Sequence, residues 1–198
     1  MTYDLVIVGG GPAGASAGIF AGRAGLRTVV IDDGNSLAQR ALVRNHLGLP
    51  DGADGPDFVA LGRRHAVSSG VEWIEDEVTS LSVQDDVVTL GTAAGQTFRA
   101  LDVLLTQGVR TELATEAGIA AEAGREPWIK TVLTVDSSGR TSVPHVWAAG
   151  TLAGTSVHTI ITAGDGARVA VNVISAQRGE RHVDHDSLEA PPEHANAG

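Results

Sequence analysis

The chain has 198 residues, a formal charge of −10 and no cysteine. An acidic balance argues against nucleic-acid or acidic-membrane binding as the main activity, because phosphate groups attract basic faces. The lack of cysteine excludes a disulfide framework, a thiolate metal site and a thiol redox centre. No apolar run has the length of a membrane span, and the first residues lack the pattern of a signal peptide. We therefore expect a cytoplasmic protein.

The first 32 residues predict a strand, a helix and a second strand. Residues 4–8 form a short apolar run that is typical of a strand buried on both faces. Residues 13–24 predict a helix of small side chains, which Gly25 ends. Residues 28–32 predict another buried strand, with Asp32 at its end. We expect the two strands to be parallel and the crossover between them to be right-handed.

The rest of the chain predicts an alternation of strands and helices. Short apolar runs broken by acids and glycines, from about 78 to 100, indicate a small antiparallel meander. Residues 33–55 are expected to be irregular, and residues 108–130 loop-like with one turn of helix. The other expected elements are helices over 57–68 and 157–177 and strands over 71–74, 101–106, 131–135 and 145–149.

These elements predict one α/β domain over residues 1–181. It should be a three-layer Rossmann-like domain with a central parallel sheet, into which the meander is inserted. Residues 182–198 show no periodicity and are expected to form a flexible tail. His182 and His185 lie in this tail beside acids, where we interpret them as solvated charges and expect no metal site.

A glycine-rich loop follows the first strand and opens the first helix. Gly9-x-Gly11-x-x-Gly14 has the spacing of a dinucleotide-binding loop, in which the glycines allow a tight turn, close approach of a pyrophosphate, and close helix–strand packing. The helix N-terminus offers N–H groups to the phosphates. Asp32, 18 residues after Gly14, stands where a carboxylate accepts ribose hydroxyls. Asp33 is interpreted as a solvated turn residue. The loop predicts a dinucleotide without separating FAD from NAD.

Five segments resemble the FAD-binding domain of the thioredoxin reductase family of pyridine nucleotide-disulfide oxidoreductases. The similarity runs from Asp4 to about Arg178, with a central gap. The five segments are VIVGGGPAGASAG at 6–18, the stretch 34–45 that in the family runs under the flavin and ends in asparagine, LLTQG at 104–108 in place of the family's "ATG" strand end, TSVPHVWAAG at 141–150 beside the family's "TSVPGVFAAGD", and TAGDGA at 162–167, where a helix opens beneath the flavin.

The resemblance implies a non-covalently bound FAD, with adenine read by backbone near Val78. The flavin would lie between Asn45 and the helix that begins near Thr159, whose dipole would stabilise negative charge on the reduced ring. His158 is a candidate catalytic residue that would add positive charge, and a capping or surface histidine is the alternative. The residues expected to contact the cofactor are Gly9, Gly11, Pro12, Ala13, Gly14, Asp32, Asp33, Asn45, Val78, Gln107, Gly108, Gly150, Thr151, His158, Thr159 and Ile160.

The chain also departs from this family. Its reductases carry an inserted NAD(P)H-binding domain and a redox-active CxxC, and neither is present here. The step from Gly108 to Gly150 covers 42 residues, too few for a second unit of about 100 residues. Locally, Thr151 replaces the acid expected to hold the ribityl chain, Gln107 replaces a threonine, and residues 35–36 replace a Gly-Gln pair.

We therefore expect an FAD-dependent oxidoreductase without a thiol relay of its own. It would exchange hydride or electrons at an exposed flavin with an external donor, NAD(P)H or a redox protein, and with an unidentified acceptor. A flavin- or nucleotide-binding module without turnover, acting as a sensor, carrier or subunit, is the alternative, and NAD in place of FAD is a third hypothesis. A homodimer is expected, because loss of the second domain exposes apolar surface. Trp73, Trp128 and Trp147 are expected to pack in a core or an interface.

Overall fold

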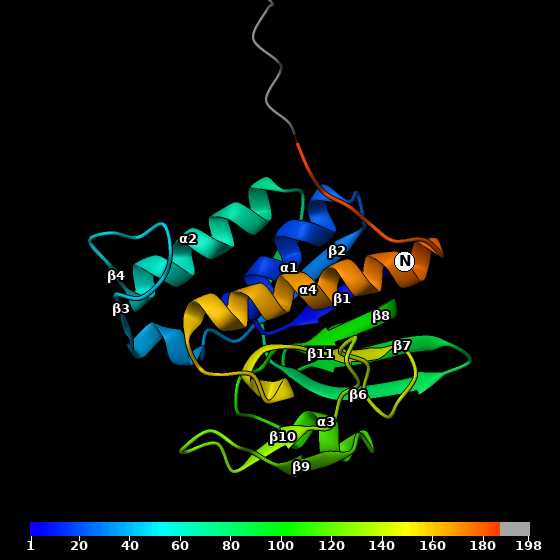
Figure 1. The fold of residues 1–198 in the computed structure, drawn as a ribbon. Coiled ribbons are helices and arrows are strands. Elements are labelled where there is room, and N and C mark those ends of the chain that lie inside the picture. The colour runs from blue at the N-terminus through cyan, green and yellow to red at the C-terminus, as the bar shows by residue number, and fades with distance from the viewer. Residues whose placement is uncertain (187–198) are drawn as a thin grey trace, which may run out of the picture.

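In the computed structural model, which describes residues 1–186, a seven-stranded sheet lies beneath three long helices (Figure 1). The elements in chain order are β1 (Thr2–Val8), α1 (Pro12–Arg23), β2 (Thr28–Asp32), the 3-10 turn η1 (Leu37–Arg40), β3 (Leu42–Val43), β4 (Ala53–Asp54), α2 (Gly55–Ser68), β5 (Glu72–Glu75), β6 (Val78–Gln84), β7 (Val87–Thr92), β8 (Thr97–Leu105), α3 (Glu112–Glu116), β9 (Ala121–Ala123), β10 (Thr131–Leu133), β11 (Val146–Ala148), η2 (Gly150–Ala153) and α4 (Thr159–Arg178). None of the helices within the described part of the chain has both the length and the apolar character needed to cross a membrane.

The sheet combines a parallel part and an antiparallel part. Its strand order is β5-β2-β1-β8-β7-β6, and β11 pairs with β8. β5, β2, β1, β8 and β11 run parallel, whereas β6 and β7 form the antiparallel meander. The expected α/β, Rossmann-like fold with a small meander is therefore confirmed.

Strand β8 is the central strand of this sheet. The sequence predicted a meander strand and a separate strand over 101–106, but they form one continuous strand. One edge of β8 pairs with β1, up to the Leu105–Val8 pair. The other edge pairs first with β7, through Ala100 and Val88, and then with β11, up to the Leu105–Ala148 pair. The parallel sheet and the meander therefore share one strand.

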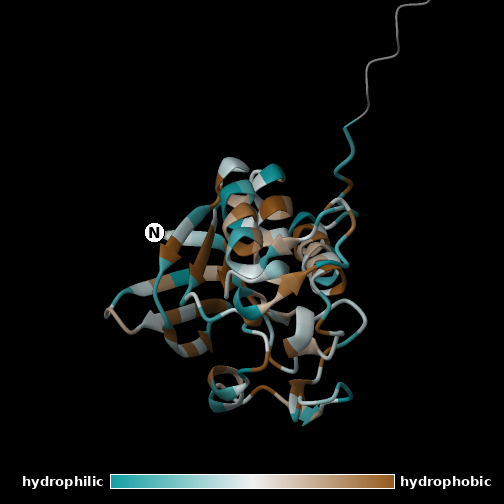
Figure 2. Ribbon diagram, turned by 90° about the vertical axis from the view of Figure 1, so that its left-hand side faces the viewer, coloured by the Kyte–Doolittle hydropathy of each residue, from teal (hydrophilic) through white to brown (hydrophobic). Residues whose placement is uncertain are grey.

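Alternation along the strands divides the core between the two faces of the sheet. Leu5 and Ile7 of β1 pack with the cluster beneath α1 and α4, while Val6 and Val8 pack with the cluster on the meander side. Hydrophobic residues gather on the inner strands between these layers (Figure 2). Burial on both faces explains why the parallel strands are continuous apolar runs.

Three short regions differ from the expected pattern. The segment expected to be irregular contains η1 and the small β3–β4 hairpin. β9 lies in the expected loop and pairs with β10 in a separate two-stranded sheet. β9 was missed because its Ala-Glu-Ala sequence is exposed and has no apolar alternation. Trp128, between these strands, is 97% exposed and so does not pack in the core of this chain, whereas Trp147 is buried. The interface alternative for Trp128 stays a prediction.

The first residues of the expected tail lie against α1. Arg23 pairs with Asp184 at 2.7 Å and with Asp186 at 2.6 Å. The backbone N–H of His182 donates to Ser175 Oγ at 3.0 Å. Residues 187–198 of the expected tail lie outside the described residues.

Candidate cofactor site

The glycine loop joins the end of β1 to α1 through close backbone contacts. Gly9 adopts φ +99°, and its N–H donates to the carbonyl of Ile31 at 2.8 Å. A Cβ on Gly14 would lie 1.9 Å from the Gly9 carbonyl oxygen, so only glycine fits there. Thr106, just after β8, donates to the carbonyls of Val8 at 2.9 Å and Gly9 at 2.8 Å. This threonine, which sequence reasoning missed, fixes the loop to the central strand.

The N-terminus of α1 begins without a side-chain cap. Gly11 is the N-cap residue, Pro12 is the first helical residue, and no side chain bonds to the first turn. The next residue, Ala13, is buried at the crossing of α1 and α4, where a Cβ on Gly166 would lie 2.1 Å from the Ala13 carbonyl oxygen. The N–H groups of an uncapped first turn and the helix dipole together suit an anion such as pyrophosphate.

Asp32 lies at the end of β2, beside the glycine loop. Its side chain is almost completely buried, and Oδ1 accepts the N–H of Gly10 at 2.8 Å. Burial raises the pKa of Asp32, while the N–H groups of Gly10 and Gly34 oppose that shift. A carboxylate has about four acceptor positions, so further acceptor capacity remains for ribose hydroxyls.

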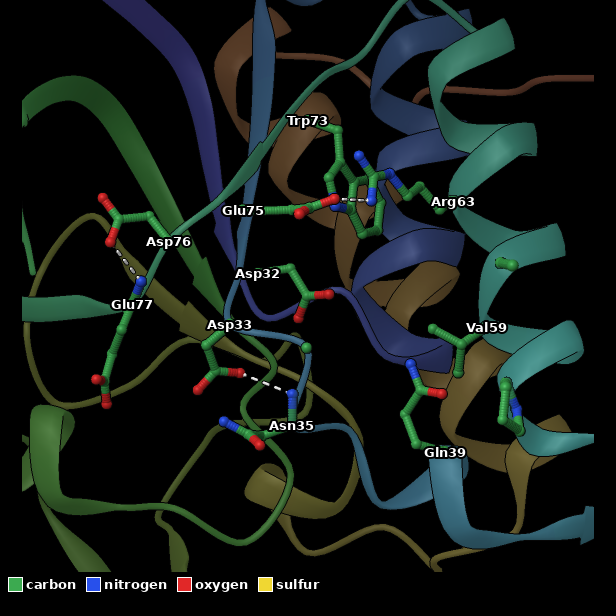
Figure 3. Close-up of a pocket in the computed structure, with 13 residues that line it drawn as sticks. Asp32, Asp33, Asn35, Gln39, Val59, Arg63, Trp73, Glu75, Asp76 and Glu77 are labelled. Carbon is green, nitrogen blue, oxygen red and sulfur yellow. Dashed lines mark hydrogen bonds and ion pairs between the residues drawn. The ribbon is translucent and has the colours of Figure 1, made fainter. Parts of the chain in front are cut away.

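A cavity of about 580 Å³ extends from Asp32 toward α2 (Figure 3). Its walls come from the ends of β2 and β5, from the segment around η1, and from one face of α2. The lining residues are Asp32, Asp33, Gly34, Asn35, Gln39, Pro56, Val59, Ala60, Arg63, Trp73, Glu75, Asp76 and Glu77. Five of these are carboxylates and one is an arginine, so the cavity favours neutral polar groups over anions.

Asp33 has a partner that the sequence did not indicate. Its side chain is only 11% exposed and pairs with Arg110, in the loop after β8. Burial alone would raise the pKa of Asp33, but the hydrogen bond and charge of Arg110, together with Asn35, hold that pKa below its usual range. The interpretation of Asp33 as a solvated turn residue is therefore wrong.

The two segments expected on either side of the flavin meet through one contact, between His46 and Thr159. Asn45 is exposed, in the loop between β3 and β4. The next residue, His46, places Nδ1 3.0 Å from the Oγ1 of Thr159, the first residue of α4, and packs against Phe58 with the ring centroids 5.0 Å apart. Burial lowers the pKa of His46, which favours the neutral imidazole. His46 was missed because nothing local marks a contact 113 residues away.

The start of α4 has no side-chain cap. His158, its N-cap residue, is exposed, and its Nδ1 lies 2.8 Å from Ser156 Oγ. His158 is therefore a surface residue whose side chain makes no capping bond, and its candidate catalytic role stays a prediction. Ile160 is also exposed. A second cavity, of about 220 Å³, lies between α1, α2 and α4, and His46 and Phe58 line it.

The ends of β8 and β11 supply the remaining expected residues. Gly108 and Gly150 adopt φ +70° and φ +73°, and Thr151 is buried in η2. The N–H of Gly150 donates to Oδ2 of the buried Asp165 at 2.8 Å. Asp165, which the sequence did not single out, therefore places a carboxylate next to Thr151. Val78 is buried at the start of β6 and does not line the 580 Å³ cavity.

Four buried polar atoms in or near this site have no hydrogen-bond partner among residues 1–186. Trp73 Nε1 and Asp76 Oδ2 belong to residues that line the 580 Å³ cavity, and the others are Gln107 Oε1 and Thr155 Oγ1. Such atoms are costly to leave unpaired and point to a missing partner. Together with Asp32 and the uncapped α1, they fit the adenosine and pyrophosphate of FAD. The resemblance places the flavin ring between Asn45 and the start of α4. In this structure, His46, next to Asn45, contacts Thr159 at the start of α4.

Comparison with known proteins shows what this chain is similar to. A family model for pyridine nucleotide-disulphide oxidoreductases matches residues 3–51. The thioredoxin reductase of Streptomyces clavuligerus is 35% identical over 109 residues, which are 53% of this chain and 34% of that protein. The thioredoxin reductase of Aquifex aeolicus is 29% identical over 109 residues, 54% of this chain and 34% of that protein. The chain therefore spans about a third of the length of these relatives.

Solved structures show the same fold over most of the chain. A thioredoxin reductase from Gloeobacter violaceus has a TM-score of 0.78 at 18% identity, covering 94% of this chain and 99% of that one. The atypical thioredoxin reductase TRi from Desulfovibrio vulgaris Hildenborough has a TM-score of 0.74 at 21% identity, covering 90% and 99%. The chain is thus thioredoxin reductase-like, in sequence over about half of its length and in fold over most of it.

Proposed function

We propose that the chain binds FAD and acts as a flavoprotein oxidoreductase. The observation that carries this proposal is the uncapped N-terminus of α1 beside Asp32 and the 580 Å³ cavity, with Gly14 packed against the Gly9 carbonyl. Bound FAD would supply the hydride and electron chemistry, and the chain would supply binding, orientation and electrostatics.

Each part of the site has a distinct binding role in this proposal. The first N–H groups of α1 bind the pyrophosphate, and Asp32 accepts hydrogen bonds from the ribose hydroxyls. The uncapped N-terminus of α4 directs its positive dipole toward the flavin end. The buried Asp165 holds the backbone of Gly150 at the junction between them.

The electron donor and acceptor come from outside the chain in this proposal. NAD(P)H or a redox protein would supply the electrons, because the 42-residue step from Gly108 to Gly150 has no room for a nicotinamide-binding domain. No cysteine is present to relay electrons as a dithiol. The acceptor would therefore react at the flavin itself, or bring its own thiols.

A second candidate is a flavin- or nucleotide-binding module without turnover. The contact between His46 and Thr159 favours it, because this contact closes the flavin end while the adenosine end stays open. Such a module would act as a sensor, carrier or subunit of a redox complex.

Cofactor binding and reduction separate these candidates. The purified chain is mixed with FAD, gel-filtered, and the retained ligand is identified by absorbance and mass spectrometry. The flavin-loaded chain is then mixed anaerobically with NADH or NADPH, followed by oxygen or a quinone dye. Bleaching and reoxidation support the oxidoreductase. Retained FAD that neither donor bleaches supports the module; no retained FAD overturns the oxidoreductase, and no retained nucleotide of any kind overturns both. Retained NAD would replace FAD as the cofactor.

A further inference from the structure

The second cavity, of about 220 Å³, is separate from the position that the resemblance gives to the flavin ring. That position lies between Asn45 and Thr159, and neither of these residues lines the cavity. His46 lines the cavity and contacts Thr159, so its imidazole forms a wall between the two places. Gly10 and Gly11 also line the cavity, which places it next to the proposed pyrophosphate site.

The walls of this cavity are mostly apolar. Of the described residues that line it, none is an aspartate, a glutamate, a lysine or an arginine. Ile19, Val59 and Leu61 supply aliphatic surface, and Phe58 supplies an aromatic ring. The larger cavity, by contrast, has carboxylates and an arginine in its walls. The 220 Å³ cavity therefore favours an uncharged, apolar ligand, because a charge placed there would find no partner.

Two histidines add hydrogen-bonding groups to these walls. Nδ1 of His46 is engaged with the hydroxyl of Thr159, and its Nε2 makes no hydrogen bond within residues 1–186. Burial lowers the pKa of His46, which favours the neutral ring. When the hydroxyl of Thr159 donates to Nδ1, Nε2 carries the ring proton and is a donor. His65, an exposed residue of α2, brings a second imidazole to the same cavity. A ligand that presents acceptors, such as carbonyl oxygens, suits these two groups.

The size of the cavity limits the ligand to one or two rings. An apolar cavity of about 150 Å³ holds benzene, so a volume of about 220 Å³ fits a substituted ring or a fused pair. The rings of His46 and Phe58 pack together in the wall and offer an aromatic surface for a flat ligand. Leu61 is 48% exposed, and His46 and Phe58 are only half-buried, so a ligand can reach these walls from solvent.

We propose that this cavity binds a small quinone, whose carbonyl oxygens accept hydrogen bonds from His46 and His65. The inference rests on the proposed oxidoreductase activity, because it names the class of the electron acceptor. Reduction of a quinone to its hydroquinone takes two electrons and two protons. NAD(P)H, as the donor, supplies both electrons and one proton as hydride, and solvent supplies the second proton. The quinone would lie one side chain, His46, away from the position given to the flavin ring.

Binding of a quinone to the chain without FAD tests the site directly. The probe is para-naphthoquinone, and calorimetry compares it with naphthalene, which lacks the carbonyls, and with naphthoquinone sulfonate, which adds a charge. The chain has no cysteine, so the quinone cannot form a thiol adduct that imitates binding.

Three variants accompany the native chain in this experiment. Ser16→Leu fills the cavity from α1, and His65→Ala removes one of the two donors. Ala176→Leu is the matched control for the added leucine, because Ala176 is exposed on α4 and lines neither cavity. Thermal unfolding checks that each variant is folded.

We expect the native chain and A176L to bind para-naphthoquinone on the order of tenfold more tightly than naphthalene, because the carbonyls gain hydrogen bonds. The sulfonate should bind more weakly than the neutral quinone, because the cavity offers no partner for its charge. H65A should lose about three- to tenfold in affinity for the quinone, and S16L should show no measurable binding. Equal binding of naphthalene would overturn the assignment to a quinone, and native-like binding by S16L would overturn the site.

The same measurements separate this inference from the proposed function. If the chain binds para-naphthoquinone but retains no FAD, the proposed oxidoreductase fails while the binding site stands. If the chain retains FAD that NADH or NADPH bleaches but does not bind para-naphthoquinone, this inference alone fails.

Discussion

The two ends of the candidate site differ in whether they hold an open cavity for a ligand. At the adenosine end, Asp32, the uncapped α1 and a 580 Å³ cavity stand ready beside an unpaired indole N–H. At the flavin end, His46 bonds directly to Thr159. The first end is held by backbone contacts between regular elements, whereas the second depends on a loop. For the proposed FAD complex, this difference predicts that affinity resides in the nucleotide half and that access of the flavin ring depends on the loop.

The largest expected effect comes from breaking the adenosine end with Gly14→Ala. The new Cβ would fall 1.9 Å from the Gly9 carbonyl oxygen, so the helix must move away from the strand. We expect a loss of about 3 kcal/mol of stability and no measurable FAD binding. Denaturant unfolding and FAD titration measure both quantities.

Gly164→Ala is the matched control for this change. A Cβ on Gly164 in α4 would meet nothing within 4 Å. Alanine should therefore leave FAD binding intact and stabilise the helix by up to about 1 kcal/mol. If G14A binds FAD like G164A, close packing of the glycine loop is not what forms the site.

An intermediate effect is expected from His46→Ala, which opens the flavin end. The hydrogen bond to Thr159 stabilises the closed loop by on the order of 1 kcal/mol. Without it the loop opens more often, so FAD should associate up to about tenfold faster. Stopped-flow flavin fluorescence measures the rate. His185→Ala, an exposed histidine that lines neither cavity, keeps the contact and should behave like the native chain. Slower or weaker binding by H46A would show that His46 holds the flavin instead of closing its position.

The smallest change in stability is expected from Arg110→Met. This variant removes the ion pair with Asp33 that joins the loops after β2 and β8. The pKa of Asp33 lies below its usual value, so the pair stabilises the fold above about pH 4, and this contribution is lost as the pH falls through the lower, folded-state pKa. We expect a loss of about 1 kcal/mol at pH 7 after solvent screening, and almost none near pH 2.

Chemical denaturation across this pH range checks the expectation for R110M. The exposed Arg64→Met serves as the control for loss of one positive charge. A loss in R110M that stays constant with pH would assign the effect to packing of the long side chain and not to its charge.

The sequence predicted the parallel part of the fold and the glycine loop closely. β1, α1 and β2 begin and end within two residues of the expected bounds, because burial on both faces and the helix-ending Gly25 leave local signals. Asp32 was placed correctly at the end of its strand for the same reason. The order of the strands around β8 was not predicted, because no local pattern indicates which distant strands pair.

The parts that were missed all depend on long-range contacts. His46 and Thr159 are 113 residues apart, and Arg110 and Asp33 are 77 apart. In neither pair does a periodicity or a motif around one residue indicate the other residue. Trp73 was assigned to packing because an aromatic residue in a strand is usually buried; its unpaired nitrogen appears only when the cavity is known.

The double pairing of β8 has a consequence for how this architecture tolerates insertion. Leu105 is locked between Val8 on one side and Ala148 on the other. Between these pairs, only exposed turns such as the one at Trp128 can change length without disturbing the core, because Leu113, Ile119 and Leu133 of the same segment are buried. An insertion at that turn would therefore be expected to leave the pairing of β1, β8 and β11 intact.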